Sequence, residues 1–177
     1  MFFINVILPI LIIYSFAAYM IFKTSKELKN KNMKKLIIMR GWPGSGKSFL
    51  AKKISEQYIN SSICSADHYH IINGEYKFNY KKIGDSHKYC FALASFIMSD
   101  SILEHREKCV VIIDNTNIKR SEYKPYLILA DKLGFETEIR ESEAPWKHDA
   151  QKCFEKCEHN VELKTITKMM NNFEKHE

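Results

Sequence analysis

The chain has almost no excess of positive charge outside its first 35 residues. Residues 1–35 contain six lysines and one acidic residue, Glu27, which gives this segment a net charge of +5. Residues 36–177 contain 21 basic and 20 acidic residues and are therefore nearly neutral. A strongly basic face is the usual electrostatic footprint of a nucleic-acid-binding protein. The overall charge of +6 is thus concentrated in one short segment and is no argument for nucleic-acid binding by the rest.

A set of paired cysteines is also lacking. The chain has five cysteines, an odd number, and two of them lie in apolar strand-like runs. This pattern favours reduced thiols over a disulfide framework. Cys153 and Cys157 are four residues apart on a predicted helix, with His148 and His159 nearby, which leaves a metal site open. No second cysteine pair stands at zinc spacing, however, and the signatures of zinc-type and helix-turn-helix nucleic-acid binders are missing.

Charge is absent from Phe2 to Phe22, a run of 21 residues. As a helix this run would extend about 30 Å, the thickness of a bilayer core. The lysines of residues 23–35 follow directly, so the positive-inside rule keeps that flank in the cytoplasm, near an anionic leaflet. We therefore expect a single-pass membrane protein with a transmembrane anchor at 1–22, a basic linker at 23–35 and a cytosolic domain at 36–177. A cleaved signal peptide, which would need a basic residue before the apolar run, and a buried segment are the alternatives.

Residues 36–177 show alternating strand-like and helix-like patterns, without repeats or low-complexity tracts. Strands are predicted at 36–39, 62–65, 110–114 and 135–140, helices at 47–59, 86–105, 121–133, 148–158 and 162–173, and mostly loop at 73–85. Gly134 is predicted to end the third helix. Alternating units of this length predict an α/β fold, a three-layer αβα domain of the P-loop kinase type with a mostly parallel sheet.

The stretch GWPGSGKS at 41–48 fits the pattern G-x4-G-K-[ST], with a predicted strand before it and a helix after it. Its glycines let backbone N–H groups turn inward toward phosphate oxygens, and the helix adds its positive dipole end. Lys47 would reach the β- and γ-phosphates of ATP, and the Ser48 hydroxyl would bind Mg²⁺. The predicted nucleotide-binding residues are Gly41, Trp42, Pro43, Gly44, Ser45, Gly46, Lys47, Ser48 and Phe49.

Two aspartates follow other predicted strands. Asp114 ends the run VVIID, and Asp67 follows the second strand in ICSADHYH. Open parallel sheets bind ligands outside the carboxyl ends of their strands, so both carboxylates should lie near the phosphates. Asp114 would help Ser48 to hold Mg²⁺, and Asp67 would accept the proton of an attacking hydroxyl. A simple turn residue at Asp114 and an Asx-turn or helix cap at Asp67 are the structural alternatives.

Together these motifs resemble the P-loop polynucleotide 5′-kinase family. The matching stretches, which span about residues 36–175, are RGWPGSGKS at 40–48, SADHYH at 65–70, GEYKF at 74–78, IIDNTN at 112–117 and PW at 145–146. The resemblance implies ATP-dependent phosphorylation of the 5′-hydroxyl of RNA or DNA. In that reading Lys47 and Ser48 take the phosphate and magnesium roles, Asp67 is the general base and Asp114 is the acidic residue at a strand end.

Two positions depart from the family pattern. His70 stands where the phage-type enzymes have an arginine that holds the substrate phosphate, and Lys156 stands where a lid arginine is expected at the transition state. Lysine supplies charge but no bidentate fork. The predicted catalytic residues are therefore Lys47, Asp67 and Lys156, in an enzyme whose activity could be reduced.

Three functions remain open from the sequence. The first is a membrane-anchored kinase for polynucleotide 5′ ends, the second is a kinase for a small hydroxyl substrate such as a nucleoside or sugar, and the third is an ATP-binding module with little transfer activity. The P-loop domain also resembles the amino-terminal half of 2′,3′-cyclic nucleotide phosphodiesterases. The paired H-x-[ST] motifs of the phosphodiesterase half are absent, so that activity is not expected.

Overall fold

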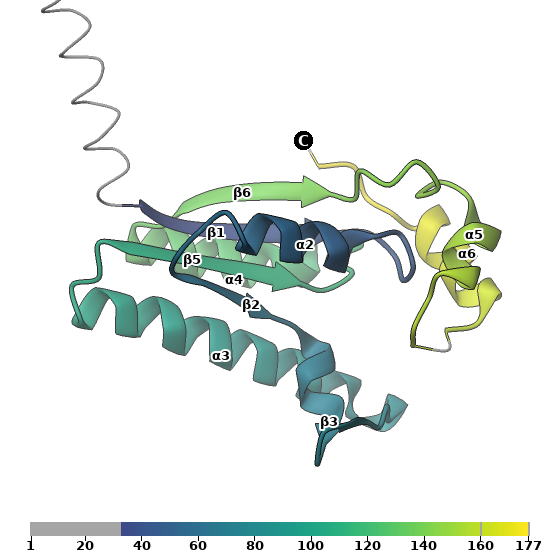
Figure 1. The fold of residues 1–177 in the computed structure, drawn as a ribbon, viewed down its shortest axis with the longest axis horizontal. Helices are drawn as coiled ribbons and strands as arrows, with labels where there is room; N and C mark the ends of the chain where they lie inside the picture. Colours follow the sequence, from purple (N-terminus) through teal and green to yellow (C-terminus); the bar gives the residue numbers. More distant parts are fainter. Residues whose placement is uncertain (1–32, 160, 177) are drawn as a thin grey trace, which may run out of the picture. The chain divides into compact units, whose positions relative to one another are not determined.

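The computed structural model describes residues 33–159 and 161–176 (Figure 1). The predicted anchor at 1–22 lies outside these residues, as does most of the predicted linker. Its last three residues belong to the first strand, which begins at Met33 and not at residue 36 as predicted. Among the helices of the described residues, none combines the length and apolar character that crossing a membrane needs.

A four-stranded sheet forms the centre of the domain. Its strands are β1 (Met33–Arg40), β2 (Ser61–Cys64), β5 (Lys108–Asp114) and β6 (Glu136–Glu141). They lie side by side in the order β2-β5-β1-β6, and β1 runs parallel to β6 as β2 does to β5. The arrowheads of β5 and β6 point toward the same end of the molecule, where α5 (Ala150–Glu155) and α6 (Leu163–Asn171) lie (Figure 1). The mostly parallel sheet of the sequence prediction is confirmed.

Both faces of the sheet are covered, which explains why its central strands are continuous apolar runs. Leu36 and Ile38 of β1 pack on one face with α3 (Ile83–Leu103) and α4 (Arg120–Leu133). Ile37 and Met39 point to the other face, against α2 (Lys47–Ser55). Successive residues of a strand alternate between faces, so this one strand supplies both cores. The result is the predicted three-layer αβα arrangement.

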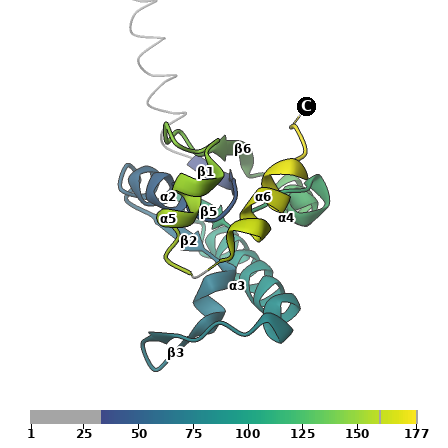
Figure 2. The same cartoon turned by 90° about the vertical axis from the view of Figure 1, so that its right-hand side faces the viewer.

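A third apolar cluster lies beyond the carboxyl ends of the strands. Trp42 and Ile118, from the loops after β1 and β5, pack there with Cys153 of α5 and Ile166 of α6. Figure 2 shows this end from the front, with α5 and α6 nearest the viewer. These two helices therefore pack against the loop that follows β1, which is the glycine-rich segment predicted to bind phosphate.

The helices differ from the predictions mainly at their ends. Helix α2 ends at Ser55, before residue 59; α3 begins at Ile83; and α5 is shorter than predicted. The predicted loop at 73–85 contains β4 (Glu75–Tyr76), which pairs with β3 (Ile71–Ile72) as a small hairpin, and the 3-10 turn η2 (Tyr80–Lys82). Gly134 takes a left-handed conformation after α4, as predicted.

Candidate phosphoryl-transfer site

The glycine-rich loop is held at its start by a hydrogen bond to the loop after β5 and continues at its end into α2. The N–H of Gly41 donates to the Thr116 carbonyl at 2.9 Å, and α2 begins directly after the loop at Lys47. Gly44 and Gly46 have φ values of 72° and 91°, which residues with a Cβ atom rarely adopt. A Cβ at Gly44 would also lie 1.8 Å from the Cys153 carbonyl oxygen. Glycine at 44 is thus needed both for the turn and for the close approach of α5.

Lys47 and Asp114 meet at the carboxyl end of the sheet. The Lys47 ammonium lies 3.6 Å from Oδ1 of Asp114, and the two side chains are only 11% and 10% exposed. This distance is longer than a hydrogen bond, and Oδ1 has no hydrogen-bond partner among the described residues. The Ser48 hydroxyl is 3.4 Å from the same ammonium group. A buried, unsatisfied carboxylate oxygen beside a hydroxyl fits the oxygen ligands that Mg²⁺ prefers.

Side chains of the strand ends tie the loops of the site to one another. The Ser65 hydroxyl donates to the Asp114 carbonyl at 2.9 Å, and Asn115 Oδ1 accepts from the Ala66 N–H at 2.8 Å. The amide of Asn117 donates to the Met39 carbonyl at 2.7 Å. The ends of β1, β2 and β5 are therefore held together by buried hydrogen bonds. The sequence identifies these asparagines only as part of a motif, and the structure adds their hydrogen-bond partners.

Asp67 lies on the short 3-10 helix η1 (Ala66–His70) that follows β2. The N-cap of this helix is Ser65, whose hydroxyl accepts from the Asp67 N–H at 3.2 Å. The capping alternative is therefore wrong for Asp67, and its side chain is not used to hold the turn. Its Oδ1 accepts instead from the Tyr76 hydroxyl of the hairpin at 3.0 Å. Burial first, and then the Asp67 charge, raise the pKa of Tyr76, which keeps this donor protonated.

His70 is buried, with only 3% of its surface exposed. Its ring packs against the rings of Tyr76 and Phe78, with centroid distances of 6.1 and 5.0 Å. A side chain in this position supports the hairpin. It does not offer an exposed cation to a substrate phosphate, as the family's arginine does at the matching position.

Lys156 lies at the C-cap of α5, with its ammonium 4.6 Å from the ring centre of Trp146. The indole N–H of Trp146 donates to the Gly44 carbonyl at 3.1 Å. This chain of contacts brings the predicted catalytic lysine beside the glycine-rich loop. Trp42 is buried and its indole N–H donates to the Cys153 sulfur at 3.3 Å. Phe49, the last of the predicted nucleotide-binding residues, is 76% exposed on α2.

The structure does not support the metal alternative at Cys153 and Cys157. The Cys153 thiol is buried in the apolar cluster and is engaged by Trp42. No group of three or more histidine, cysteine or acidic side chains is placed to hold a metal ion within residues 33–159 and 161–176.

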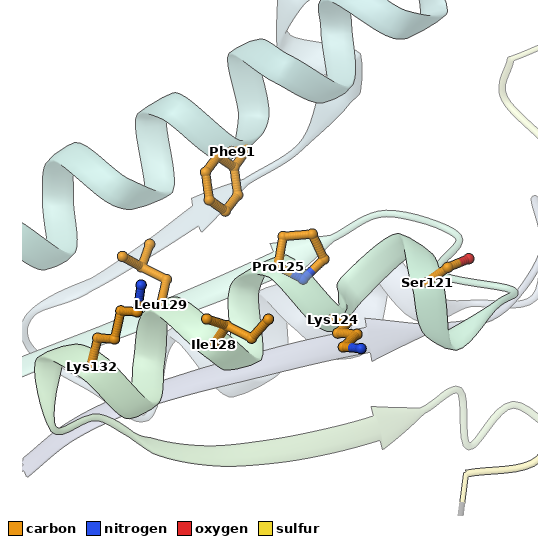
Figure 3. Close-up of a pocket in the computed structure, with 7 residues that line it drawn as sticks. All are labelled: Phe91, Ser121, Lys124, Pro125, Ile128, Leu129 and Lys132. Carbon is orange, nitrogen blue, oxygen red and sulfur yellow. The ribbon is translucent and has the colours of Figure 1, made fainter.

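Two clefts differ in their relation to this site. One, of about 400 Å³, lies between α3 and α4 and is lined mainly by apolar side chains such as Phe91 and Ile128 (Figure 3). It contains no residue of the glycine-rich loop and no carboxylate, so it is not the transfer site. The other borders the loop at Gly41 and Ser45, and three cationic side chains, Arg40, Lys147 and Lys175, line it together with a single acidic one, Glu141. The charge of this second cleft favours an anionic ligand.

Comparison with known proteins gives a consistent result. The family described as AAA domain matches residues 36–176. NEDD4-binding protein 2 of Homo sapiens is 34% identical over 140 residues, which are 79% of this chain and 8% of that protein. The 2′,3′-cyclic-nucleotide 3′-phosphodiesterase of Rattus norvegicus is 31% identical over 146 residues, which are 80% of this chain and 32% of that protein. The chain thus spans less than a third of either relative.

Among solved structures, a chain of the Pnkp1/Rnl/Hen1 RNA repair complex superposes with a TM-score of 0.58. The match covers 80% of this chain and 44% of that chain, at 16% sequence identity. At this identity the likeness describes the fold.

Proposed function

The chain belongs to the AAA domain family, among the P-loop polynucleotide-kinase-like proteins, and from that premise we propose that it transfers the γ-phosphate of ATP to the 5′-hydroxyl of a polynucleotide. The observation that carries this proposal is the position and exposure of the Asp67 carboxylate. Its carboxylate follows β2, is not used as a cap, and is 42% exposed at its side chain. A base for an acceptor hydroxyl needs to be both positioned and accessible.

In the proposed reaction the acceptor hydroxyl gives its proton to Asp67 while its oxygen attacks the γ-phosphorus. The bond from that phosphorus to the β–γ bridging oxygen breaks, and ADP leaves. Lys47 faces the β- and γ-phosphates from the start of α2 and offsets the charge that builds up there. Ser48 and Asp114 would hold Mg²⁺, which supplies charge neutralisation at the phosphates.

A polynucleotide acceptor is supported by the hairpin region that follows Asp67. Three of its aromatic side chains are exposed: Tyr76 by 37%, Phe78 by 54% and Tyr80 by 70%. Lysines alternate with them, and the ammonium of Lys81 lies 5.8 Å from the ring centre of Tyr80. Aromatic faces next to cations are the usual means of binding single-stranded nucleic acid without sequence preference. A small nucleoside or sugar would not need such a surface.

An ATP-binding module with weak transfer is the second candidate. It is favoured by one observation, the replacement of the two family arginines by the buried His70 and by Lys156. An arginine at the transition state can contribute about 10³-fold or more to the rate. This candidate predicts ATP binding with a turnover that hardly changes when Asp67 is altered.

The deciding experiment is transfer of radiolabel from γ-labelled ATP to a 5′-hydroxyl oligonucleotide, in RNA and DNA forms. A 5′-phosphorylated oligonucleotide and free nucleosides serve as acceptor controls. We expect Asp67→Asn to lower transfer by about 10²–10⁴-fold while ATP binding remains. Asp131→Asn, the same change at an exposed position of α4, should have no effect. ATP binding without transfer by the unaltered chain, or full activity of Asp67→Asn, would contradict the proposal.

We propose further that the domain acts at the cytosolic face of a membrane. This rests on the uncharged run at 2–22 and the lysines after it. Release of the intact full chain into the soluble fraction on carbonate extraction would contradict it.

A further inference from the structure

The carboxylate of Asp67 faces side chains from two other parts of the chain. The Tyr76 hydroxyl, from the hairpin, donates to Oδ1 at 3.0 Å. His159, from the segment after α5, has its Nε2 atom 3.8 Å from Oδ2. The rings of Tyr76 and His159 also contact each other, with centroids 4.6 Å apart and planes tilted by 37°. One carboxylate thus has a different neighbour at each of its two oxygens.

The two neighbours differ in how they meet the carboxylate. Tyr76 makes a hydrogen bond of ordinary length, which fixes the rotation of the Asp67 side chain and occupies Oδ1. His159 stands too far from Oδ2 for a direct hydrogen bond. The two atoms are 3.8 Å apart. One oxygen atom can therefore lie about 2.8 Å from both of them and make a hydrogen bond to each.

We propose that Tyr76 and His159 complete an acceptor-hydroxyl site around Asp67, in which Tyr76 positions the carboxylate and His159 contacts the hydroxyl itself. This rests on the proposed function, since it takes Asp67 as the base. The hydroxyl donates to Oδ2 of Asp67, and its oxygen accepts from the Nε2–H of His159. The proton then moves to Oδ2 as the oxygen–phosphorus bond forms and the bond to ADP breaks. It leaves Asp67 for water once the phosphorylated product has gone.

Exposure is consistent with a site that a large acceptor can reach. The side chains of Asp67 and His159 are 42% and 40% exposed, and Tyr76 is 37% exposed. His159 follows α5, the helix whose Cys153 packs on Trp42 in the glycine-rich loop. The acceptor site is therefore linked through α5 to the loop that would hold the phosphate donor. Such a link would hold the acceptor hydroxyl at a fixed position relative to the γ-phosphate. Holding two reacting groups in the right geometry is a large source of rate acceleration.

The test uses the full chain with Tyr76→Phe, which removes only the hydroxyl, and with His159→Phe and His159→Gln. The phenylalanine keeps a ring against Tyr76, and the glutamine keeps an N–H donor. Tyr89→Phe and His87→Gln, at exposed positions of α3, are the matched controls. The readouts are kcat, the separate KM values for oligonucleotide and ATP, and the thermal unfolding midpoint.

We expect Tyr76→Phe to lower kcat about tenfold, as loss of one hydrogen bond can, with the KM for ATP unchanged. His159→Phe should lower kcat/KM for the oligonucleotide by a similar factor, and His159→Gln should restore most of it. Equal activity of His159→Phe and the unaltered chain, or a Tyr76→Phe kcat within twofold of the control, would overturn this proposal while the proposed function stands. A chain that binds ATP and phosphorylates no hydroxyl would overturn both proposals together.

Discussion

The proposed phosphate-donor end of the site and the proposed acceptor end are built in different ways. Lys47 and Asp114 are about nine-tenths buried, and the loops around them are joined by buried hydrogen bonds to the backbone of neighbouring strands. Asp67 and Tyr76, on the proposed acceptor side, are about 40% exposed and are joined by one side-chain hydrogen bond. The donor end is therefore part of the sheet, whereas the acceptor end is an assembly of surface segments.

This difference indicates where specificity can vary. A buried polar network is costly to alter, because each change leaves a partner unsatisfied in the interior. Exposed residues on a hairpin and a connecting segment can change without that penalty, as binding residues on loops commonly do.

The largest effect should come from Lys47→Met, which removes the charge of the donor end and keeps much of the side-chain volume. Transfer is expected to fall by about 10²–10³-fold, the usual cost of losing one group that stabilises transition-state charge. ATP affinity should fall as well, as measured by calorimetry. Asp67→Asn is the matched acceptor change, and it should leave ATP affinity unaltered. If Asp67→Asn lost as much ATP affinity as Lys47→Met, the proposal that the two residues serve separate donor and acceptor ends would be wrong.

The second effect tests how closely α5 approaches the glycine-rich loop. Gly44→Ala puts a Cβ where it meets the Cys153 carbonyl oxygen at 1.8 Å, in a backbone conformation with φ of 72°. Overpacking of this kind costs about 1–3 kcal/mol of unfolding free energy, which chemical denaturation would measure. Gly84→Ala is the control, since nothing lies within 4 Å of its added Cβ. If Gly44→Ala were as stable as Gly84→Ala, α5 would not be fixed against the loop.

Lys156 contacts Trp146, which is hydrogen-bonded to the glycine-rich loop. We expect its replacement to lower the transfer rate less than Lys47→Met does. Lys156→Ala should lower kcat about tenfold, well short of what an arginine in such a role can contribute. Lys156→Arg should raise kcat above that of the unaltered chain, because guanidinium can donate two parallel hydrogen bonds to phosphate oxygens. Stopped-time transfer assays at saturating ATP and oligonucleotide would measure both. Unchanged kcat in Lys156→Ala, with a lower unfolding midpoint, would give the lysine a purely structural role on Trp146.

The residues of the buried end of the site could be predicted from the sequence, whereas part of the exposed end could not. Lys47 and Ser48 follow from a local motif, and Asp67 and Asp114 follow from their places after apolar strand runs, since strand ends of a parallel sheet share an edge. His159 could not be found in this way. Its contact with Tyr76 joins segments far apart in the sequence, through exposed side chains that leave no hydrophobic pattern.

The exposed position of Phe49 shows a related limit. The residue fits a helical apolar spacing with Leu50 and Ile54, which are buried, yet it lies on the outer side of α2. Spacing over a helix of nine residues does not settle which residues lie at the edge of the apolar face. The contact of Lys156 with Trp146 could likewise not be predicted, because a cation–π pair has no fixed spacing in the sequence.

The smallest effect concerns the ion pair that joins β1 to β6. Lys35 and Glu138 lie 2.7 Å apart with side chains 16% and 32% exposed, and the lysine hydrogen bond is the main cause of a lowered pKa at Glu138. The pKa of Lys35 is raised from 10.5, chiefly by the same bond. Because a lowered carboxyl pKa stabilises the fold above its ordinary value of 4.5, this contribution disappears as the pH falls through the lowered value. Because the pKa of Lys35 is raised, the contribution is also lost at high pH, as the pH rises above 10.5 and the lysine loses its charge.

Lys35→Gln should therefore lower the unfolding free energy by about 0.5–1 kcal/mol at pH 7, and by nothing measurable near pH 2, where Glu138 is protonated. Urea unfolding at the two pH values measures the difference. Lys164→Gln is the control: its pair with Glu162 is equally short, but the side chains are 82% and 65% exposed, so its removal should leave the urea midpoint unchanged. A Lys35 effect no larger than that of Lys164 would mean that this ion pair contributes nothing measurable to the pairing of β1 with β6.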